Sequence, residues 1–252
     1  MKARIKFCKY GSLRFIGHLD VMRYFQKVMR RADIPIAFTG GYSPHMIMSF
    51  AQPLGVGVTS SGEYLDIELT KPVASKQTVA QMNAVMAEGI EVVSFVKIPE
   101  EKKYSGMTIT AAADYRVTFL ASGRSAEKIC PVPEDLKEQV KAFLAQPKIK
   151  VLKATKRSEK EVDIRPMIYA MEAGDEDIRL FLAAGSENNL KPDLLMEAFL
   201  GFCGKEKEAY PLHFHRMDVY ARNPAIPADA MERNKKGVGL VTLESLGKEI
   251  TG

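Results

Sequence analysis

The chain has 252 residues, of which 46% are hydrophobic and 27% are charged, with a net charge of +5. This is the composition of an ordinary globular protein, and the length fits one large or two small domains. It excludes a collagen-like or low-complexity chain, and no apolar run approaches the roughly 18 residues that cross a bilayer. The basic N-terminus lacks the apolar stretch of a signal peptide, so we expect a soluble, cytoplasmic protein that does not bind membranes.

The N-terminal part of the chain predicts the element order of a ferredoxin-like unit. Residues 2–8 alternate between basic and apolar side chains, which indicates a half-buried strand. Residues 18–32 carry apolar side chains three or four positions apart, which indicates an amphipathic helix with a basic outer face, ended by Pro35. The remaining elements are strands at 46–50, 63–69 and 90–97 and a helix at 75–88. Together they give the order β-α-β-β-α-β.

A charged, turn-rich linker at 99–105 separates this unit from a second α+β set. That set comprises strands at 114–121, 148–154, 162–172, 177–184 and 214–221 and helices at 133–146 and 191–203. The sequence thus predicts an α+β protein with two ferredoxin-like α/β sandwich domains in tandem, at residues 1–104 and 105–222. Residues 223–252 show little periodicity and are predicted to form a C-terminal tail or an ordered arm.

The positive charge is concentrated near the N-terminus. Residues 1–31 carry a net charge of +8, because Asp20 is their only acidic residue. The basic residues of this segment are Lys2, Arg4, Lys6, Lys9, Arg14, Arg23, Lys27, Arg30 and Arg31. A second basic cluster comprises Lys148, Lys150, Lys153, Lys156, Arg157 and Lys160. Such clusters are typical of surfaces for phosphate-rich partners, although a solvated face without a partner is the commoner explanation of any single cluster.

Several common reaction centres are absent from the sequence. The three cysteines, Cys8, Cys130 and Cys203, are too dispersed for a disulfide framework, a zinc site or the CxxxCxxC motif of a radical S-adenosylmethionine enzyme. Residues 57–62 have phosphate-loop spacing, but Glu63 follows where that motif requires lysine. The sequence also contains neither GxGxxG nor GxSxG. We therefore predict that the chain itself holds no cofactor and no metal.

Candidates for proton transfer, phosphate contact or metal binding lie beside a predicted helix start and in a glycine-rich loop. His18 and Asp20 begin the first helix, where free backbone N–H groups favour an anion. His45 follows two glycines in the loop 39–45. Structural roles are also available, because Asp20 stabilises the helix dipole and His18 can cap or pack against the helix.

Two further histidines and three serines give weaker signals. His213 and His215 share one side of a predicted strand, which allows metal chelation. Ordinary packing explains this pair better, because no third ligand is near in the sequence. Ser49, Ser60 and Ser61 have no evident base beside them, so a serine hydrolase is only weakly indicated.

Three segments of the N-terminal part resemble a known family. They are KYGSLRFIGHLD at 9–20, GGYSPH running into SFAQPL within 40–54, and EYLD at 63–66. In this order and spacing they resemble the radical-SAM-linked domain family, a family of unknown function, and residues 162–166 and 189–192 match further family segments. The resemblance covers about residues 2–200. It implies an accessory role beside a radical S-adenosylmethionine protein, and no demonstrated reaction of the chain itself.

Together these observations predict an accessory protein that binds tRNA or rRNA and presents it to a radical S-adenosylmethionine partner enzyme. The residues predicted to bind RNA are Arg4, Lys6, Arg14, Arg23, Lys27, Arg30 and Arg31. One alternative is a hydrolytic or nuclease-like enzyme that uses His18, Asp20 and His45. Another is a protein–protein scaffold whose basic face meets an acidic patch on its partner.

Overall fold

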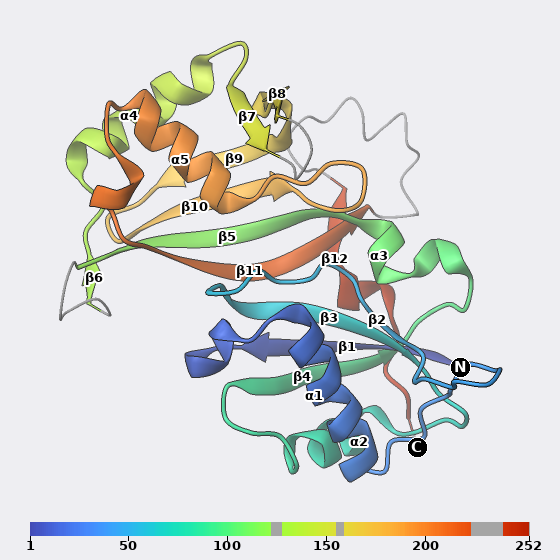
Figure 1. Ribbon diagram of the computed structural model, residues 1–252. Helices are drawn as coiled ribbons and strands as arrows, with labels where there is room; N and C mark the ends of the chain where they lie inside the picture. The colour runs from blue at the N-terminus through green and yellow to red at the C-terminus, as the bar shows by residue number, and fades with distance from the viewer. Residues whose placement is uncertain (122–127, 155–158, 223–238, 252) are drawn as a thin grey trace.

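The computed structural model describes residues 1–121, 128–154, 159–222 and 239–251 (Figure 1). Within these residues ten strands form one mixed sheet, in the main order β4-β1-β3-β11-β5-β10-β9, and five α-helices accompany it. The predicted α+β class is therefore confirmed. None of the helices in the described part of the chain is long and apolar enough to cross a membrane.

The first half of the sheet is centred on β1, which is antiparallel to both β3 and β4. Its elements are β1 (Lys2–Lys9), α1 (His18–Arg31), β2 (Met48–Phe50), β3 (Thr59–Glu68), α2 (Ser75–Asn83) and β4 (Ile90–Lys97). Ala3, Ile5 and Phe7 are buried on one face of β1, in the same core as Phe25 and Met29 of α1. Because side chains alternate along a strand, the other face of β1 carries most of its basic residues.

The second half repeats this layering, with α4 and α5 covering one face of β9 and β10 (Figure 1). Its elements are α3 (Gly106–Ile109), β5 (Thr110–Leu120), β6 (Ile129–Cys130), α4 (Glu134–Ala145), β7 (Lys150–Ala154), β8 (Glu159–Asp163), β9 (Ile168–Ala173), β10 (Asp177–Ala183), α5 (Pro192–Phe202) and β11 (Leu212–Arg222). Phe143 of α4 and Phe199 of α5 pack with ring centroids 5.3 Å apart. They share a core with Val117 and Leu180 of the sheet. β7 and β8 form a separate two-stranded hairpin.

The two halves meet where β3 runs parallel to β11. The pairing spans two residue pairs, Thr59 with His215 and Ser60 with Arg216. Next to it Gly62 lies so close to β11 that a Cβ there would come within 2.8 Å of the opposite backbone. A glycine at this position therefore lets the two strands approach each other.

Buried ion pairs link the halves across this seam. Arg216 of β11 is 2% exposed and pairs with Glu63 of β3, and its guanidinium also donates to the carbonyl oxygen of Gln52 at 2.6 Å. On the opposite face Lys6 of β1 pairs with Asp218 of β11 at 2.8 Å. Removing one member of such a pair leaves an uncompensated charge in the interior.

The C-terminal segment returns to the first half of the sheet. β12 (Leu240–Thr242) pairs with β11, and a 3-10 turn at Leu243–Leu246 follows it. Lys248 then forms a bridge to Lys97 at the end of β4. Both termini consequently lie at the same side of the first half (Figure 1). Residues 223–238 of the predicted tail lie outside the described residues.

The single strand predicted at 162–172 is wrong, because the chain turns in the middle of it. β8 and β9 are separated by a 3-10 turn at Arg165–Met167. Pro166 has no N–H for a strand ladder. The carboxylate of Asp163 accepts the backbone N–H of Arg165 at 3.0 Å and that of Ile149 at 2.9 Å, which stabilises the turn.

Candidate functional site

His18, Asp20 and His45, the predicted catalytic residues, are held by separate local contacts. The ring of His18, the first residue of α1, packs edge-on against Phe50 with centroids 5.0 Å apart. Asp20 pairs with an arginine of its own helix on the exposed side. His45 lies in an exposed loop with Nδ1 at 3.1 Å from Thr39 Oγ1. Within the described residues, no hydrogen bond, ion pair or ring contact joins any two of the three.

We call Arg4, Lys6 and Lys9 of β1 the strand cations, and each is held inside the protein. Arg4 is 1% exposed, and its guanidinium donates to both carboxylate oxygens of Asp66, at 2.7 and 2.9 Å. It also donates to the backbone carbonyls of Tyr104 and Leu243, which ties the linker and the C-terminal segment to β1. Arg4, which was predicted to contact RNA, is therefore not available to do so, because its donors are engaged within the fold.

Lys6 and Lys9 are also engaged. Lys6 Nζ lies 2.8 Å from Asp218 and 3.4 Å from Glu244. Burial lowers the pKa of Lys6, but the hydrogen bond and charge of Asp218, with those of Glu244, outweigh burial and raise the pKa overall. Lys9 is 2% exposed and donates to the carbonyl oxygen of Ile16 at 3.2 Å, and burial lowers its pKa. Neither ammonium group is free for a surface partner.

The basic residues of α1 lie on the outside instead. We call Arg23, Lys27, Arg30 and Arg31 the α1 cationic surface, and all four are exposed. A helix turns by about 100° per residue, so the spacing of Arg23, Lys27 and Arg30 places these three on one face. In the described part of the chain only Arg23 has a carboxylate partner, Asp20 at 3.2 Å. The other three cations are available to an external anion.

The local sequence explains why α1 presents these cations outward. Val21, Phe25, Val28 and Met29 recur three or four positions apart and are buried against the sheet. The basic residues occupy the opposite side of the helix and are exposed, whereas Met22 and Tyr24 at the edges are half-buried against the same core. Arg30 and Arg31 also occupy the last turn, where a positive charge complements the negative end of the helix dipole.

Exposed apolar side chains continue this surface toward the start of α1. Phe15 is 61% exposed, and the guanidinium of the half-buried Arg14 lies 4.7 Å from the centre of its ring. Leu19, one turn before Arg23, is 67% exposed. An aromatic ring beside cations is the arrangement on which nucleobases stack.

The second basic cluster is more dispersed. Lys148 and Lys160 are exposed, whereas Lys150 is engaged with Glu161 at 2.7 Å across the β7–β8 hairpin. The remaining members, for which the structure describes no side chain, are Lys153, Lys156 and Arg157. The described part of this cluster therefore offers fewer free cations than α1.

A chain of hydroxyl and imidazole groups lies where β3 meets β11, and we call Ser61, His215, Thr59 and His213 the seam cluster. Ser61 Oγ lies 2.8 Å from His215 Nε2, and His215 Nδ1 lies 2.7 Å from Thr59 Oγ1. Thr59 Oγ1 in turn lies 3.0 Å from His213 Nε2. His213 and His215 thus contact the same hydroxyl, which their predicted position on one side of a strand allows.

The surroundings of the seam cluster favour neutral imidazoles. Burial lowers the pKa of His213, and the charge of Arg14 lowers it further. Burial likewise lowers the pKa of His215, with smaller contributions from His213 and Arg116. A neutral imidazole has one N–H and one acceptor nitrogen. The donors can consequently all point from Ser61 toward His213, or all point from His213 toward Ser61. A switch between the two arrangements would relay a proton along the seam cluster.

His215 lies beside Ser61 as a base that the sequence did not predict. Ser61 and His215 lie 154 positions apart, and they meet only through the short parallel pairing of β3 with β11. The alternate spacing of His213 and His215 was the one available signal. It predicted a shared side of the strand without indicating what lies opposite.

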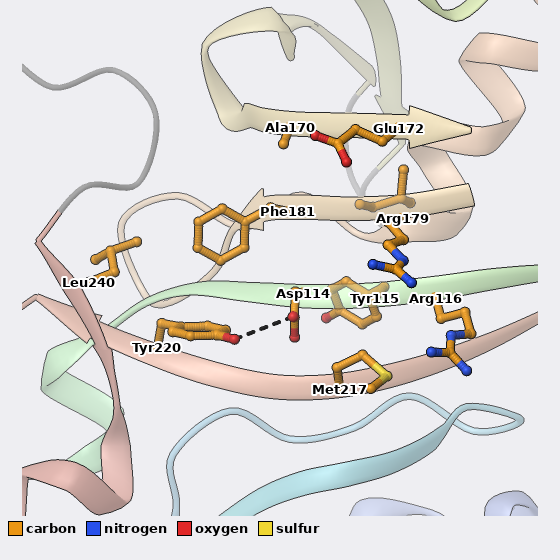
Figure 2. A pocket seen from close by; sticks show the side chains of 11 residues that line it. Asp114, Tyr115, Arg116, Ala170, Glu172, Arg179, Phe181, Met217, Tyr220 and Leu240 are labelled. Atoms are coloured by element: carbon orange, nitrogen blue, oxygen red, sulfur yellow. Dashed lines mark hydrogen bonds between the residues drawn. The ribbon is translucent and has the colours of Figure 1, made fainter. Parts of the chain in front are cut away.

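A cavity of about 450 Å³ lies on the sheet face of the second half opposite α4 and α5 (Figure 2). Asp114 and Arg116 point into it from β5, where they alternate with residues of the core. Figure 2 shows Phe181 and Tyr220 at one end and Arg116 and Arg179 at the other. None of these residues was predicted as a site from the sequence, because they come from five different strands, β5, β9, β10, β11 and β12, with one to three residues from each.

The potential metal ligands are also dispersed. No group of three or more His, Cys, Asp or Glu side chains that could hold a metal ion occurs in the described ranges. Cys8 lies on β1, Cys130 on β6 and Cys203 at the C-terminal end of α5, and all three are free and half-buried. The thiols thus lie on three separate elements.

Comparison with known proteins identifies the family. No curated protein is detectably similar to the chain. A solved structure titled "Crystal Structure of a Cbf5-Nop10-Gar1 Complex" contains a similar chain, with a TM-score of 0.43 and 12% identity over 97% of this chain and 61% of that one. The protein thus spans about three fifths of that neighbour, and so weak a likeness carries no argument about function. The family model described as "Uncharacterized protein conserved in bacteria (DUF2344)" matches residues 2–192, so the chain belongs to this uncharacterised family.

Proposed function

We propose that the protein binds RNA through the α1 cationic surface and serves as an accessory protein to a radical S-adenosylmethionine enzyme. The observation that carries the RNA-binding part is the exposure of four cations on one helix, three of them without a carboxylate partner in the described residues. The strand cations nearby are engaged internally, so α1 holds most of the available charge of the basic N-terminal segment.

The physical basis is phosphate neutralisation. Each phosphate that a lysine or arginine neutralises releases condensed counterions from the RNA, which supplies free energy without sequence readout. A cation that already pairs with a carboxylate must exchange one partner for another, whereas Lys27, Arg30 and Arg31 need not. Phe15, which precedes α1, adds an exposed ring beside the Arg14 guanidinium, and stacking on an aromatic side chain contributes about 1–3 kcal/mol per base. The surface therefore suits exposed strands of tRNA or rRNA.

The accessory part of the proposal rests on the sequence resemblance to radical-SAM-linked domains. A tagged copy isolated at low salt from the cell that makes the protein is expected to retain a radical S-adenosylmethionine partner. Isolation of the tagged chain without any iron–sulfur protein contradicts this part of the proposal and leaves the RNA-binding part standing.

We also propose that the chain comprises two ferredoxin-like units, at residues 1–104 and 105–222. Two strand orders support this. In the first half the strands lie side by side in the order β4-β1-β3-β2, and in the second half in the order β11-β5-β10-β9. If the four strands of each half are numbered along the chain, both orders read 4-1-3-2, which is the strand order of a βαββαβ ferredoxin-like unit. The first half carries α1 and α2, and the second carries α4 and α5.

The RNA-binding proposal is tested by reversing charge on α1. Arg23→Glu, Lys27→Glu and Arg30→Glu are combined in one variant, and its affinity for fluorescent tRNA and rRNA fragments is measured by anisotropy at low salt. We expect binding to every RNA to weaken by at least about tenfold, because phosphate contacts act on all sequences alike.

The matched control changes the same charge elsewhere. Lys141→Glu, Lys148→Glu and Lys160→Glu replace three exposed lysines of the second half that have no ion pair in the described residues. This control is expected to lose far less affinity than the α1 variant. Equal losses in the two variants, or no binding by the wild-type protein at low salt, contradict the proposal.

Hydrolysis is a second candidate function, favoured by the Ser61 Oγ–His215 Nε2 distance of 2.8 Å. In such a site the Ser61 oxygen attacks the substrate while His215, whose pKa is lowered by burial in favour of the neutral form, takes the hydroxyl proton. A fluorophosphonate probe tests it, because attack by Ser61 expels fluoride and leaves a covalent label. Labelling of the wild-type protein but not of Ser61→Ala or His215→Gln supports this function. A wild-type protein that remains unlabelled contradicts it.

A further inference from the structure

The cavity on the open face of the second half has two chemically different ends (Figure 2). Phe181 and Tyr220 form the apolar end, with ring centroids 5.2 Å apart and planes at 86°. Tyr169 packs on the other side of Phe181 at 5.6 Å, which limits rotation of that ring. Two perpendicular rings make a corner that accepts a flat molecule, with its face on one ring and its edge on the other.

The opposite end carries two guanidinium groups on neighbouring strands. Arg116 of β5 and Arg179 of β10 face each other in register. Asp177 lies between them, with carboxylate oxygens at 2.9 Å from Arg116 Nε and 3.7 Å from Arg179 Nε. One carboxylate thus serves both guanidinium groups, and among the described residues no hydrogen bond involves a terminal Nη group of either arginine. Terminal guanidinium groups bind phosphate oxygens well.

Asp114 lies between the two ends (Figure 2). One of its carboxylate oxygens accepts the backbone N–H of Asp218 at 2.8 Å, and the other lies 3.3 Å from the hydroxyl of Tyr220. A carboxylate has about four acceptor positions, so these two bonds leave acceptor capacity for a ligand. Burial raises the pKa of Asp114, although both hydrogen bonds oppose the shift. An N–H donor on a ligand therefore finds a partly desolvated acceptor in the middle of the cavity.

We propose that this cavity binds one nucleoside phosphate, with the base in the Phe181–Tyr220 corner, a base N–H on Asp114 and the phosphate at Arg116 and Arg179. The aromatic corner, the Asp114 carboxylate and the two guanidinium groups follow one another in the order base, base edge, phosphate, and Glu172 of β9 lines the cavity opposite Arg179. A cavity of about 450 Å³ is within the size range of small-molecule sites. The site goes beyond the proposed function, because it uses none of the α1 cations.

The first experiment compares ligands that contain parts of the proposed unit. Binding of the four nucleoside monophosphates, the four nucleosides and inorganic phosphate is measured by isothermal titration calorimetry on the full chain. At least one monophosphate is expected to bind more tightly than its nucleoside and than phosphate, because only the monophosphate reaches both ends of the cavity. Failure of every monophosphate to bind at millimolar concentrations overturns the proposal.

Two substitutions assign binding to the cavity. Phe181→Leu removes the ring, and Arg179→Gln removes the charge of a side chain that is 71% exposed, so the fold should tolerate its loss. Each is expected to weaken monophosphate binding by at least about tenfold. Arg179→Gln should not weaken binding of the nucleoside, because the nucleoside has no phosphate. The matched control is Lys141→Gln on α4. Wild-type affinity in both cavity variants overturns the proposal.

The source of the nucleotide is distinguished with a short single-stranded oligonucleotide. If the natural ligand is a nucleotide unit within RNA, the oligonucleotide should bind more tightly than any monophosphate, and Phe181→Leu should weaken the binding of both ligands. If the natural ligand is a free nucleotide, the oligonucleotide should bind no more tightly than the monophosphate. The α1 triple variant should keep wild-type affinity for the monophosphate. RNA binding that fails while monophosphate binding persists therefore contradicts the proposed function alone, and the reverse result contradicts this inference alone.

Discussion

The strand cations and the α1 cationic surface come from one basic segment of 31 residues, yet the fold uses them in opposite ways. Arg4 and Lys9 are almost completely buried, and Lys6 lies between two carboxylates. The cations of α1 are exposed, and most have no partner in the described residues. The difference shows that a cluster of basic residues in the sequence does not indicate whether their side chains are exposed or free to bind a partner. What separates the two groups is whether another part of the chain supplies carboxylates and carbonyl oxygens.

The strongest way to break this comparison is to remove Arg4. Arg4→Ala leaves Asp66 as an unpaired charge and deprives the carbonyl oxygens of Tyr104 and Leu243 of their donor. We expect the free energy of unfolding to fall by about 3–5 kcal/mol. Urea unfolding followed by circular dichroism measures it, with Lys27→Ala on α1 as the control. Equal stability of the two variants shows that Arg4 is not structurally engaged.

Lys6 should matter less than Arg4. Lys6→Met removes the ammonium group from Asp218, but Asp218 keeps the hydroxyl of Tyr64 at 2.6 Å and the backbone N–H of Val219 at 2.7 Å. We expect a loss of about 1–3 kcal/mol in the free energy of unfolding, measured by the same urea titration. A variant more stable than the wild type argues that Lys6 is not needed to balance the charge of Asp218.

The seam cluster contains two histidines, His213 and His215, whose charge depends on pH. The folded protein holds the pKa of His213 and His215 below their ordinary value, so unfolding takes up protons as the pH falls below about 6.5. The stability from the neutral imidazoles is therefore complete above that pH and is lost as the pH decreases. Melting temperatures between pH 7.5 and pH 5 should fall less steeply for His215→Gln than for the wild type. A wild-type slope in this variant shows that other groups cause the dependence.

The smallest effect is expected on α1 itself. Arg23→Gln breaks the exposed ion pair with Asp20, which is worth no more than about 0.5–1 kcal/mol. The melting temperature should consequently stay close to that of the wild type, while RNA affinity falls measurably. A large loss of stability identifies Arg23 as a structural residue and places it with the strand cations.

Elements with a strong local pattern were predictable from the sequence. The apolar spacing of residues 18–32 predicted α1 to within a residue, and the strand predicted at 90–97 coincides with β4. The helix predicted at 75–88 ends early, at Asn83, because the side-chain amide of Asn83 bonds the backbone of Val92 in β4. That contact depends on the tertiary fold, and a helical period does not reveal it.

The sites were less predictable, because they depend on pairing between distant strands. Arg4 looked like a surface residue, since it alternates with the apolar residues that face α1. The linker and the C-terminal segment cover the face on which it lies. Ser61 meets its base through the seam pairing, and the cavity around Asp114 collects residues from five strands. No periodicity in the sequence specifies such registers.

The most direct test of the central claim is the salt dependence of RNA binding. For single strands, the logarithm of the affinity falls with the logarithm of the salt concentration by about 0.7 per phosphate contact. If Arg23, Lys27 and Arg30 each contact a phosphate, their triple change to Glu should make this slope shallower by about 2. The control with Lys141, Lys148 and Lys160 changed to Glu should keep the wild-type slope. A wild-type slope in the α1 variant, or binding that does not depend on salt, contradicts the assignment of RNA binding to α1.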